Sequence, residues 1–270
     1  MTVNLTEKQV EELFALLKGS DSVELKVTVP DSDIRSTADL LDMDPLDAEL
    51  RQVVFFDTPD LTLSQAGVVV RARRLQGGGG DSAVKLRPIN PDNLSPEIRK
   101  SVTFKVEVDA MPRGFVCSAS MRGKSTSADI RRVILKESKI ASLFTKEQRD
   151  FYRSHAPEGL KLSDLAILGP INIMKLLFEP KALSRKFVAE LWFYPDGSRI
   201  LELSTKCTPA NAFQVAAETR NFLVQHGIDL TAEQQPKTNK ALKYFSSLQK
   251  KSAAAKTESS GDGNSPPPKD

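Results

Sequence analysis

The candidate functional residues of this sequence are charged side chains. They stand at every second position of several short segments. Residues 22–29 alternate between apolar side chains and a polar face that carries Glu24 and Lys26, as a strand with one face in the core does. The same alternation recurs down the chain. It places the following charged residues on matching strand faces: Lys26, Arg71, Arg73, Lys85, Lys105 and Lys175, with Glu24, Glu107, Asp109, Glu190 and Glu202.

Together, these two kinds of charge suit the binding of a phosphate chain. If the charged faces line the inside of a closed barrel, each charge needs a partner, water or a highly charged ligand. Lysine and arginine supply donors for phosphate oxygens, and arginine often does so through two hydrogen bonds. Carboxylates hold Mg²⁺ or Mn²⁺, which bridges to the phosphates of a substrate. Such an interior therefore favours phosphoryl transfer to an oriented water.

A simpler interpretation is that these faces contact solvent on an ordinary antiparallel sheet. Strands with one wet face are the commoner case. The alternation alone favours this interpretation and does not decide between the two.

The elements that must position these residues are about eight short strands with helices between them. Strands are expected at 22–29, 53–57, 67–73, 83–87, 101–109, 171–178, 185–193 and 200–206. Helices are expected at 6–17 and 209–225, with a short last helix from Lys237. Glycines 77–80 lack the Lys-Ser/Thr spacing of a phosphate-binding loop, so they predict a hairpin turn. The pattern indicates an α+β fold whose sheet closes into a barrel.

Two segments stand outside this pattern. Apolar residues recur at helical spacing from about 120 to 168, which predicts a helical insertion between two groups of strands. Residues 251–270 are rich in Ala, Ser, Gly, Pro and Lys, and we expect a disordered tail there. The barrel domain is accordingly expected at 1–250.

Composition excludes several classes of protein. The net charge of +3 is too small to indicate nucleic-acid binding. Two histidines make a histidine-based zinc site or a catalytic triad improbable. Cys117 and Cys207 have no metal-ligand spacing, which favours a reducing compartment. The first 18 residues lack a signal-peptide pattern, and the apolar run 165–178 is too short to span a bilayer. We therefore expect a cytoplasmic protein that contacts no membrane.

Several motifs together resemble the CYTH domain family, the triphosphate tunnel metalloenzymes. The most specific is the block Phe56-Asp57-Thr58-Pro59-Asp60-Leu61, which leads to Gly67 and then to Arg71-x-Arg73. The supporting motifs, in the family's order, are Glu24-x-Lys26, Lys85 before Arg87-Pro88, Lys105-x-Glu107-x-Asp109, Glu202 and Lys240. The resemblance covers about residues 22–248.

The resemblance implies an eight-stranded antiparallel tunnel that binds a triphosphate group and holds a divalent metal through glutamates. The residues implied to contact phosphate are Lys26, Arg71, Arg73, Lys85, Lys175 and Lys240. The residues implied to hold Mg²⁺ or Mn²⁺, or to order water, are Glu24, Glu107, Glu190 and Glu202. Trp192 shares the face of Glu190 and is a candidate to stack on a base or a thiamine ring, although packing is the commoner role of such a residue.

The chain departs from the family pattern at three positions. Ser22 stands at the first glutamate of the first-strand signature Glu-x-Glu-x-Lys, and Ser204 at the second glutamate of the last long strand. Both serines remove negative charge from the implied metal site. Lys175 stands where arginine is frequent.

The resemblance thus predicts a metal-dependent phosphohydrolase that acts on inorganic triphosphate, polyphosphate, or nucleoside or thiamine triphosphates. One alternative is ATP cyclisation, as in class IV adenylate cyclases. The other is a polyphosphate- or nucleotide-binding module whose metal site is eroded at Ser22 and Ser204. The sequence indicates no oligomeric state.

Overall fold

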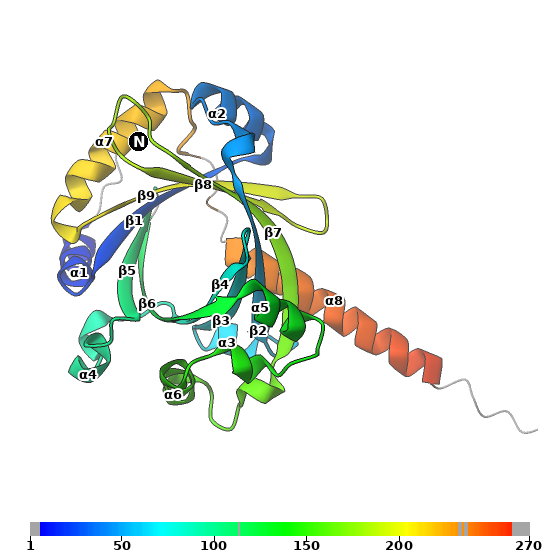
Figure 1. Ribbon diagram of the computed structural model, residues 1–270. Coiled ribbons are helices and arrows are strands. Elements are labelled where there is room, and N and C mark those ends of the chain that lie inside the picture. Colours follow the sequence, from blue (N-terminus) through cyan, green and yellow to red (C-terminus); the bar gives the residue numbers. More distant parts are fainter. Residues whose placement is uncertain (1–5, 113, 232–233, 235–236, 261–270) are drawn as a thin grey trace, which may run out of the picture.

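The computed structural model describes residues 6–112, 114–231, 234 and 237–260, with side chains described as far as Lys251. Within these residues nine strands form one closed barrel (Figure 1). They are β1 Ser22–Val29, β2 Glu49–Asp57, β3 Val68–Leu75, β4 Gly79–Leu86, β5 Phe104–Met111, β6 Gly114–Thr126, β7 Ala166–Phe178, β8 Phe187–Phe193 and β9 Arg199–Cys207. Their order around the barrel is β1-β5-β6-β4-β3-β2-β7-β8-β9, and β9 pairs with β1.

The expected closed barrel is confirmed, but the expected eight antiparallel strands are wrong in two respects. The strand that the sequence missed is β6, which begins before the expected insertion. Its inward positions carry the small residues Ser118 and Ser120 before Arg122, so the apolar–charged alternation is interrupted. The barrel is also mixed, because β1 pairs with β5 in parallel, with Glu24 opposite Asp109.

The helices other than the last lie outside the barrel wall or at its end. They are α1 Glu7–Lys18, α2 Ile34–Leu40, α3 Thr62–Gln65, α4 Pro96–Arg99, α5 Ser127–Ile134, α6 Lys146–His155, α7 Ala212–Gln225 and α8 Lys237–Ser260. Short 3-10 turns lie at Asp31–Asp33, Pro45–Asp47, Pro91–Asn93, Ile140–Leu143, Leu162–Asp164 and Pro209–Asn211.

The expected helical insertion corresponds to α5 and α6 with the short turns between β6 and β7. Its ends differ from the prediction, since residues 120–126 belong to β6 and 166–168 to β7. The last helix is longer than expected, because α8 includes residues 251–260 of the expected tail. Residues 261–270 lie outside the described part of the chain.

Two apolar clusters cover the outside of the barrel. One packs α1, α5 and α6 against strands β2 to β6, and includes Phe56, Val84 and Phe151. The other packs α7 against β1, β8 and β9, and includes Leu203 and Phe222. These clusters use the apolar faces of the strands, so the opposite faces point inward.

A third apolar cluster lies on the inward side and involves α8. Ala241, Leu242 and Phe245 pack against the inward residues Val53, Phe55, Ile171, Ile173, Trp192 and Ile200. The start of α8 is thus seated against the inner surface of β2, β7 and β8 (Figure 1). Helix α8 therefore fills one part of the barrel with apolar side chains and leaves the charged part to the other strands.

The block 56–73 acts mainly through its backbone geometry. The buried Asp57 carboxylate accepts hydrogen bonds from the backbone N–H groups of Thr58, Leu63 and Ser64, at 2.7, 2.9 and 3.0 Å. These bonds fix α3 and hence the start of β3. The following turn between β3 and β4 has positive φ at Gly77 and Gly78, 84° and 96°, which confirms the expected hairpin.

Candidate functional site

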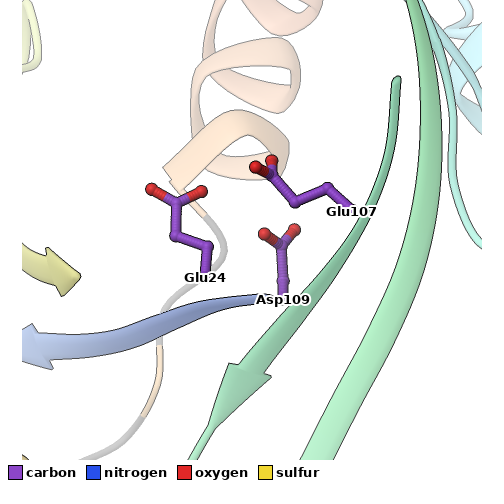
Figure 2. A group of neighbouring side chains, drawn as sticks. All are labelled: Glu24, Glu107 and Asp109. Atoms are coloured by element: carbon purple, nitrogen blue, oxygen red, sulfur yellow. The ribbon is translucent and has the colours of Figure 1, made fainter. Parts of the chain in front are cut away.

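Three carboxylates meet on the inner surface where β1 lies beside β5. Glu24, Glu107 and Asp109 point toward one another, and each offers an oxygen within 4.8 Å of the others (Figure 2). We call this group the carboxylate triad. Glu24 comes from β1 and the other two from β5, so the triad depends on the parallel pairing that the sequence did not predict.

Four cations surround the carboxylate triad. The Lys26 ammonium lies 3.0 Å from Glu24 and 2.9 Å from Asp109. Arg87 forms an ion pair with Asp109, and Lys85 is 3.9 Å from the same carboxylate. Lys206 forms an ion pair with Glu107 and lies 3.8 Å from Glu24.

These contacts set the protonation of the site. Burial by itself raises the pKa of Asp109, but the charges of Lys26, Lys85 and Arg87 outweigh it and lower that pKa to about 2. The pKa of Glu107 is lowered in the same way, since Lys206 outweighs the effect of burial. Burial lowers the pKa of Lys26, yet Glu24, Glu202 and Asp109 together raise it above its ordinary value. Glu107 and Asp109 are therefore ionised at neutral pH.

A second carboxylate group lies on β8 and β9. Glu190 and Glu202 are direct cross-strand partners, and the Lys237 ammonium at the start of α8 lies 2.5 Å from Glu190 and 2.7 Å from Glu202. Trp192 donates its indole N–H to Glu190 at 3.3 Å. Burial by itself raises the pKa of Glu190, but Lys237 outweighs it and lowers that pKa below its ordinary value. We call Glu190, Glu202 and Lys237 the α8 pair site.

A row of cations crosses the barrel from the triad toward β7. Five cations on neighbouring strands point inward, and burial together with repulsion between neighbours lowers the pKa of Arg71, Lys85 and Lys175. They are Lys85 on β4, Arg71 and Arg73 on β3, Arg51 on β2 and Lys175 on β7. Lys175 also lies opposite Glu190 and Glu49 in the strand register. We call these five residues the cation row.

The cations of this row are incompletely neutralised. Arg73 is bonded to Asp81, with its Nε 3.0 Å from both carboxylate oxygens. Arg71, by contrast, makes no ion pair within the described residues, and its buried Nε has no hydrogen-bond partner there. Burial and the neighbouring Arg73 lower the pKa of Arg71 to about 10. Burial also lowers the pKa of Lys85 to about 8, against the attraction of Asp109. An anion bound here would relieve both costs.

The structure thus divides the ten residues expected at the site. Lys26, Glu24 and Glu107 lie at the triad, and Arg71, Arg73, Lys85 and Lys175 form most of the cation row. Glu190 and Glu202 lie in the α8 pair site. Lys240 lies elsewhere, with its ammonium 4.6 Å from the centre of the Tyr194 ring. Lys105, which alternation placed inside, is exposed.

Sequence reasoning also missed several residues. Asp109 was placed on the inward face but not among the expected metal ligands, and Arg51, Arg87, Lys206 and Lys237 were given no role. Alternation from Val53 puts Arg51 on the inward face, and alternation from Ser204 does the same for Lys206. No such signal existed for Lys237, because the rotation of α8 is set by packing.

The carboxylate triad offers ligands for a divalent cation beside the cations that already contact it, whereas in the α8 pair site Lys237 lies between the two carboxylates. Three converging carboxylates supply the oxygen ligands that Mg²⁺ and Mn²⁺ prefer. At Ser22, the departure from the family signature, the hydroxyl donates to Glu107 at 3.3 Å. Ser204 lies opposite Lys26 and is buried. Trp192 is 2% exposed, so it serves packing and is closed to a stacking ligand.

Comparison with known proteins supports the fold. No family model matches the sequence, and no curated protein matches it. Among solved structures, a putative adenylate cyclase from Bacillus halodurans matches with a TM-score of 0.57 and 13% identity, over 82% of this chain and 97% of that one. A putative adenylyl cyclase from Hippeastrum, described as having a dominant triphosphatase activity, matches with a TM-score of 0.58 and 17% identity, over 80% of this chain and 92% of that one.

At these identities the likeness shows the fold. It agrees with the closed-barrel fold that the CYTH resemblance of the sequence implies. No helix in the described part of the chain has the length and apolar character needed to cross a membrane.

Proposed function

We propose that this protein is a divalent-metal-dependent phosphohydrolase that acts on triphosphate-containing substrates. The observation that carries the proposal is the cation row, in which Arg71 is buried without an ion pair among the described residues. Lys85 interacts with both Arg71 and Asp109, so it connects the cation row to the carboxylate triad. Buried, unmatched guanidinium groups are costly unless an anion binds. The fold shared with a protein described as a triphosphatase is consistent with this assignment.

The cation row suits a linear phosphate chain. Its members lie on the neighbouring strands β4, β3, β2 and β7, so at ~4.8 Å per strand the row spans roughly 14 Å. Arg71 and Arg73 offer planar donors to two phosphate oxygens each, and Lys85 and Lys175 offer point charges. None of these residues selects a base. Inorganic triphosphate or a longer polyphosphate is therefore the preferred substrate.

The chemistry belongs at the triad end of the row. Glu24, Glu107 and Asp109 would hold Mg²⁺ or Mn²⁺. The ion, when bound, polarises a phosphoryl oxygen and offsets the charge that builds up during transfer. Lys26 would contact the phosphate nearest the triad while Glu24 and Asp109 hold its ammonium in position. An ionised carboxylate of the triad is placed to accept a hydrogen bond from the attacking water and orient it.

The test is phosphate release from inorganic triphosphate by the full chain, with Mg²⁺ or Mn²⁺ and with a chelator. We expect release that the chelator stops. Glu24→Gln should abolish it while leaving the fold intact, since the change removes charge and keeps the shape. A matched control is Asp60→Asn on exposed Asp60, which pairs with the exposed Lys250. Metal-independent release, or full activity of Glu24→Gln, would contradict the proposal.

Binding without release would indicate the alternative of a binding module. In that case triphosphate raises the melting temperature of the protein, and Ser22→Glu or Ser204→Glu restores turnover by returning charge to the metal site. A protein that neither releases phosphate nor is stabilised by triphosphate has no triphosphate site.

ATP cyclisation is the second candidate, because both solved relatives are described as putative adenylate cyclases. It needs contacts to a base and a ribose, and the buried Trp192 offers none. Product analysis with ATP separates cyclic AMP and pyrophosphate from ADP and phosphate. We place this activity in a reducing compartment such as the cytoplasm, in keeping with the two free cysteines.

A further inference from the structure

Lys237 places its ammonium between the carboxylates of Glu190 and Glu202. Its ammonium lies 2.5 Å from Glu190 and 2.7 Å from Glu202, and 4.9 Å from the centre of the Trp192 ring. An ammonium has three N–H donors. Two of them meet carboxylates, and the Trp192 ring covers another side of the charge.

Glu190 and Glu202 require a neighbouring cation to offset the repulsion between their carboxylates. They are direct partners across β8 and β9, and like charges in that arrangement repel. Their side chains are only 20% and 12% exposed, so water neutralises them poorly. Burial lowers the pKa of Lys237, yet Glu190 and Glu202 raise it above its ordinary value, so the ammonium stays charged.

Helix α8 holds this ammonium in place. Ala241, Leu242 and Phe245, on the first turns of α8, pack into the inward apolar cluster. Tyr194 donates its hydroxyl to the Lys237 carbonyl at 2.9 Å. A metal ion at Glu190 and Glu202 would have to displace a charge that is anchored by the packing of a helix.

The carboxylate triad differs in this respect. Lys26 stays between Glu24 and Asp109 with a side chain that is 16% exposed, but the side chain of Lys206 is 51% exposed and that of Arg87 is 33% exposed. Both can swing toward solvent when another cation arrives. The triad also has three carboxylates, whereas Ser204 leaves the α8 pair site with two.

We propose that Lys237 is a built-in substitute for a metal ion, so that this chain binds one divalent cation, at the carboxylate triad, and none at Glu190 and Glu202. This inference rests on the proposed function for the metal at the triad. It assigns Lys237 as a positioning residue that closes the second carboxylate group.

The test is the number of Mn²⁺ ions bound by the full chain without substrate, measured from the electron paramagnetic resonance signal of free Mn²⁺. We expect one ion for the native protein and for Lys237→Arg, which keeps the charge. Lys237→Met removes the charge at similar length, and we expect a second ion there. Lys240→Met is the matched control on the same helix and should bind one.

A second pair of variants needs no change in α8. In the native background, Glu190→Gln should leave Mn²⁺ affinity and stoichiometry unchanged, whereas Asp109→Asn should abolish binding. Two ions in the native protein, a loss of Mn²⁺ in Glu190→Gln, or a single ion in folded Lys237→Met would each overturn the inference. Two ions with metal-dependent phosphate release would leave the proposed function standing. One ion without release would overturn the function and leave the role of Lys237 intact.

Discussion

The inner surface of the barrel has two regions that handle buried charge differently. In the region of α8, Glu190 and Glu202 share one ammonium, and apolar side chains fill the surrounding space. In the region of the triad and the cation row, Arg71 lacks an ion pair among the described residues, and Lys85 has a carboxylate only at 3.9 Å. The charged side chains are buried in both regions. Only in the region of the triad and the cation row are the buried cations of the described residues incompletely neutralised, and we expect the ligand to bind there.

The strongest test of this difference is Asp109→Asn. Asp109 is fully buried and has three cations around it. Because those cations would lose their counter-charge, we expect a loss of about 3–5 kcal/mol in the free energy of unfolding. We also expect a fall of at least about 100-fold in metal-dependent phosphate release. Urea unfolding and phosphate release measure the two effects. Asp60→Asn, whose partner Lys250 is exposed, is the control and should match the native protein.

Arg71→Met separates ligand binding from stability. The guanidinium is buried without an ion pair in the described chain, so its removal should keep or raise the free energy of unfolding. Loss of charge-assisted hydrogen bonds of about 1.5–3 kcal/mol should weaken triphosphate binding about 10- to 100-fold. Calorimetric titration and urea unfolding give the two values. A stability loss equal to the affinity loss would mean that Arg71 serves the fold. Arg73→Met breaks the ion pair with Asp81, so it should lower both the free energy of unfolding and the affinity for triphosphate.

The pKa of Lys85 predicts a pH dependence. Burial lowers this pKa to about 8, so the free protein loses the ammonium above pH 8. A bound phosphate favours the charged form, and binding above pH 8 must therefore take up a proton. Triphosphate affinity should fall between pH 8 and pH 10 in the native protein. The fall should be absent in Lys85→Arg, because arginine keeps its charge. The same decline in both proteins would contradict the assignment.

The smallest effect is expected for Lys240. Its half-buried side chain holds the ammonium over the Tyr194 ring, away from the cation row, so it would not contact a phosphate bound there. Lys240→Ala should change triphosphate affinity by less than about twofold. Lys175→Ala, in the cation row, should lower it clearly more. Affinity for triphosphate is measured by calorimetric titration. Equal losses of affinity in the two variants would show that Lys240 contacts phosphate, as the family resemblance implies.

The sequence predicted most strands, because apolar and charged residues alternate along β1, β5 and β9. It missed β6, where Ser118 and Ser120 interrupt the charged face that Arg122 and Lys124 continue. It also could not predict the parallel pairing of β1 with β5, since register between strands distant in the chain depends on closure. For that reason the sequence grouped Glu190 and Glu202 with Glu24 and Glu107, and the structure separates them.

The choice between Lys237 and Lys240 shows a second limit. Both stand in the first turn of α8, and either lysine fits the family's order along the chain. Which one points inward follows from the packing of Ala241, Leu242 and Phe245 into the barrel. A helix that is placed by tertiary contacts does not reveal its rotation in its own sequence.

The position of β1 between β5 and β9 has a consequence for folding. In the strand register Glu24 lies opposite Asp109 of β5 on one side and Lys206 of β9 on the other. Strand β1 therefore pairs with strands that are synthesised much later. Closing such long loops has a high entropic cost and is slow. Until β9 emerges from the ribosome, the growing sheet keeps two open edges. The triad gains its Lys206 side only at closure, so Mn²⁺ capture during refolding would time the completion of the barrel.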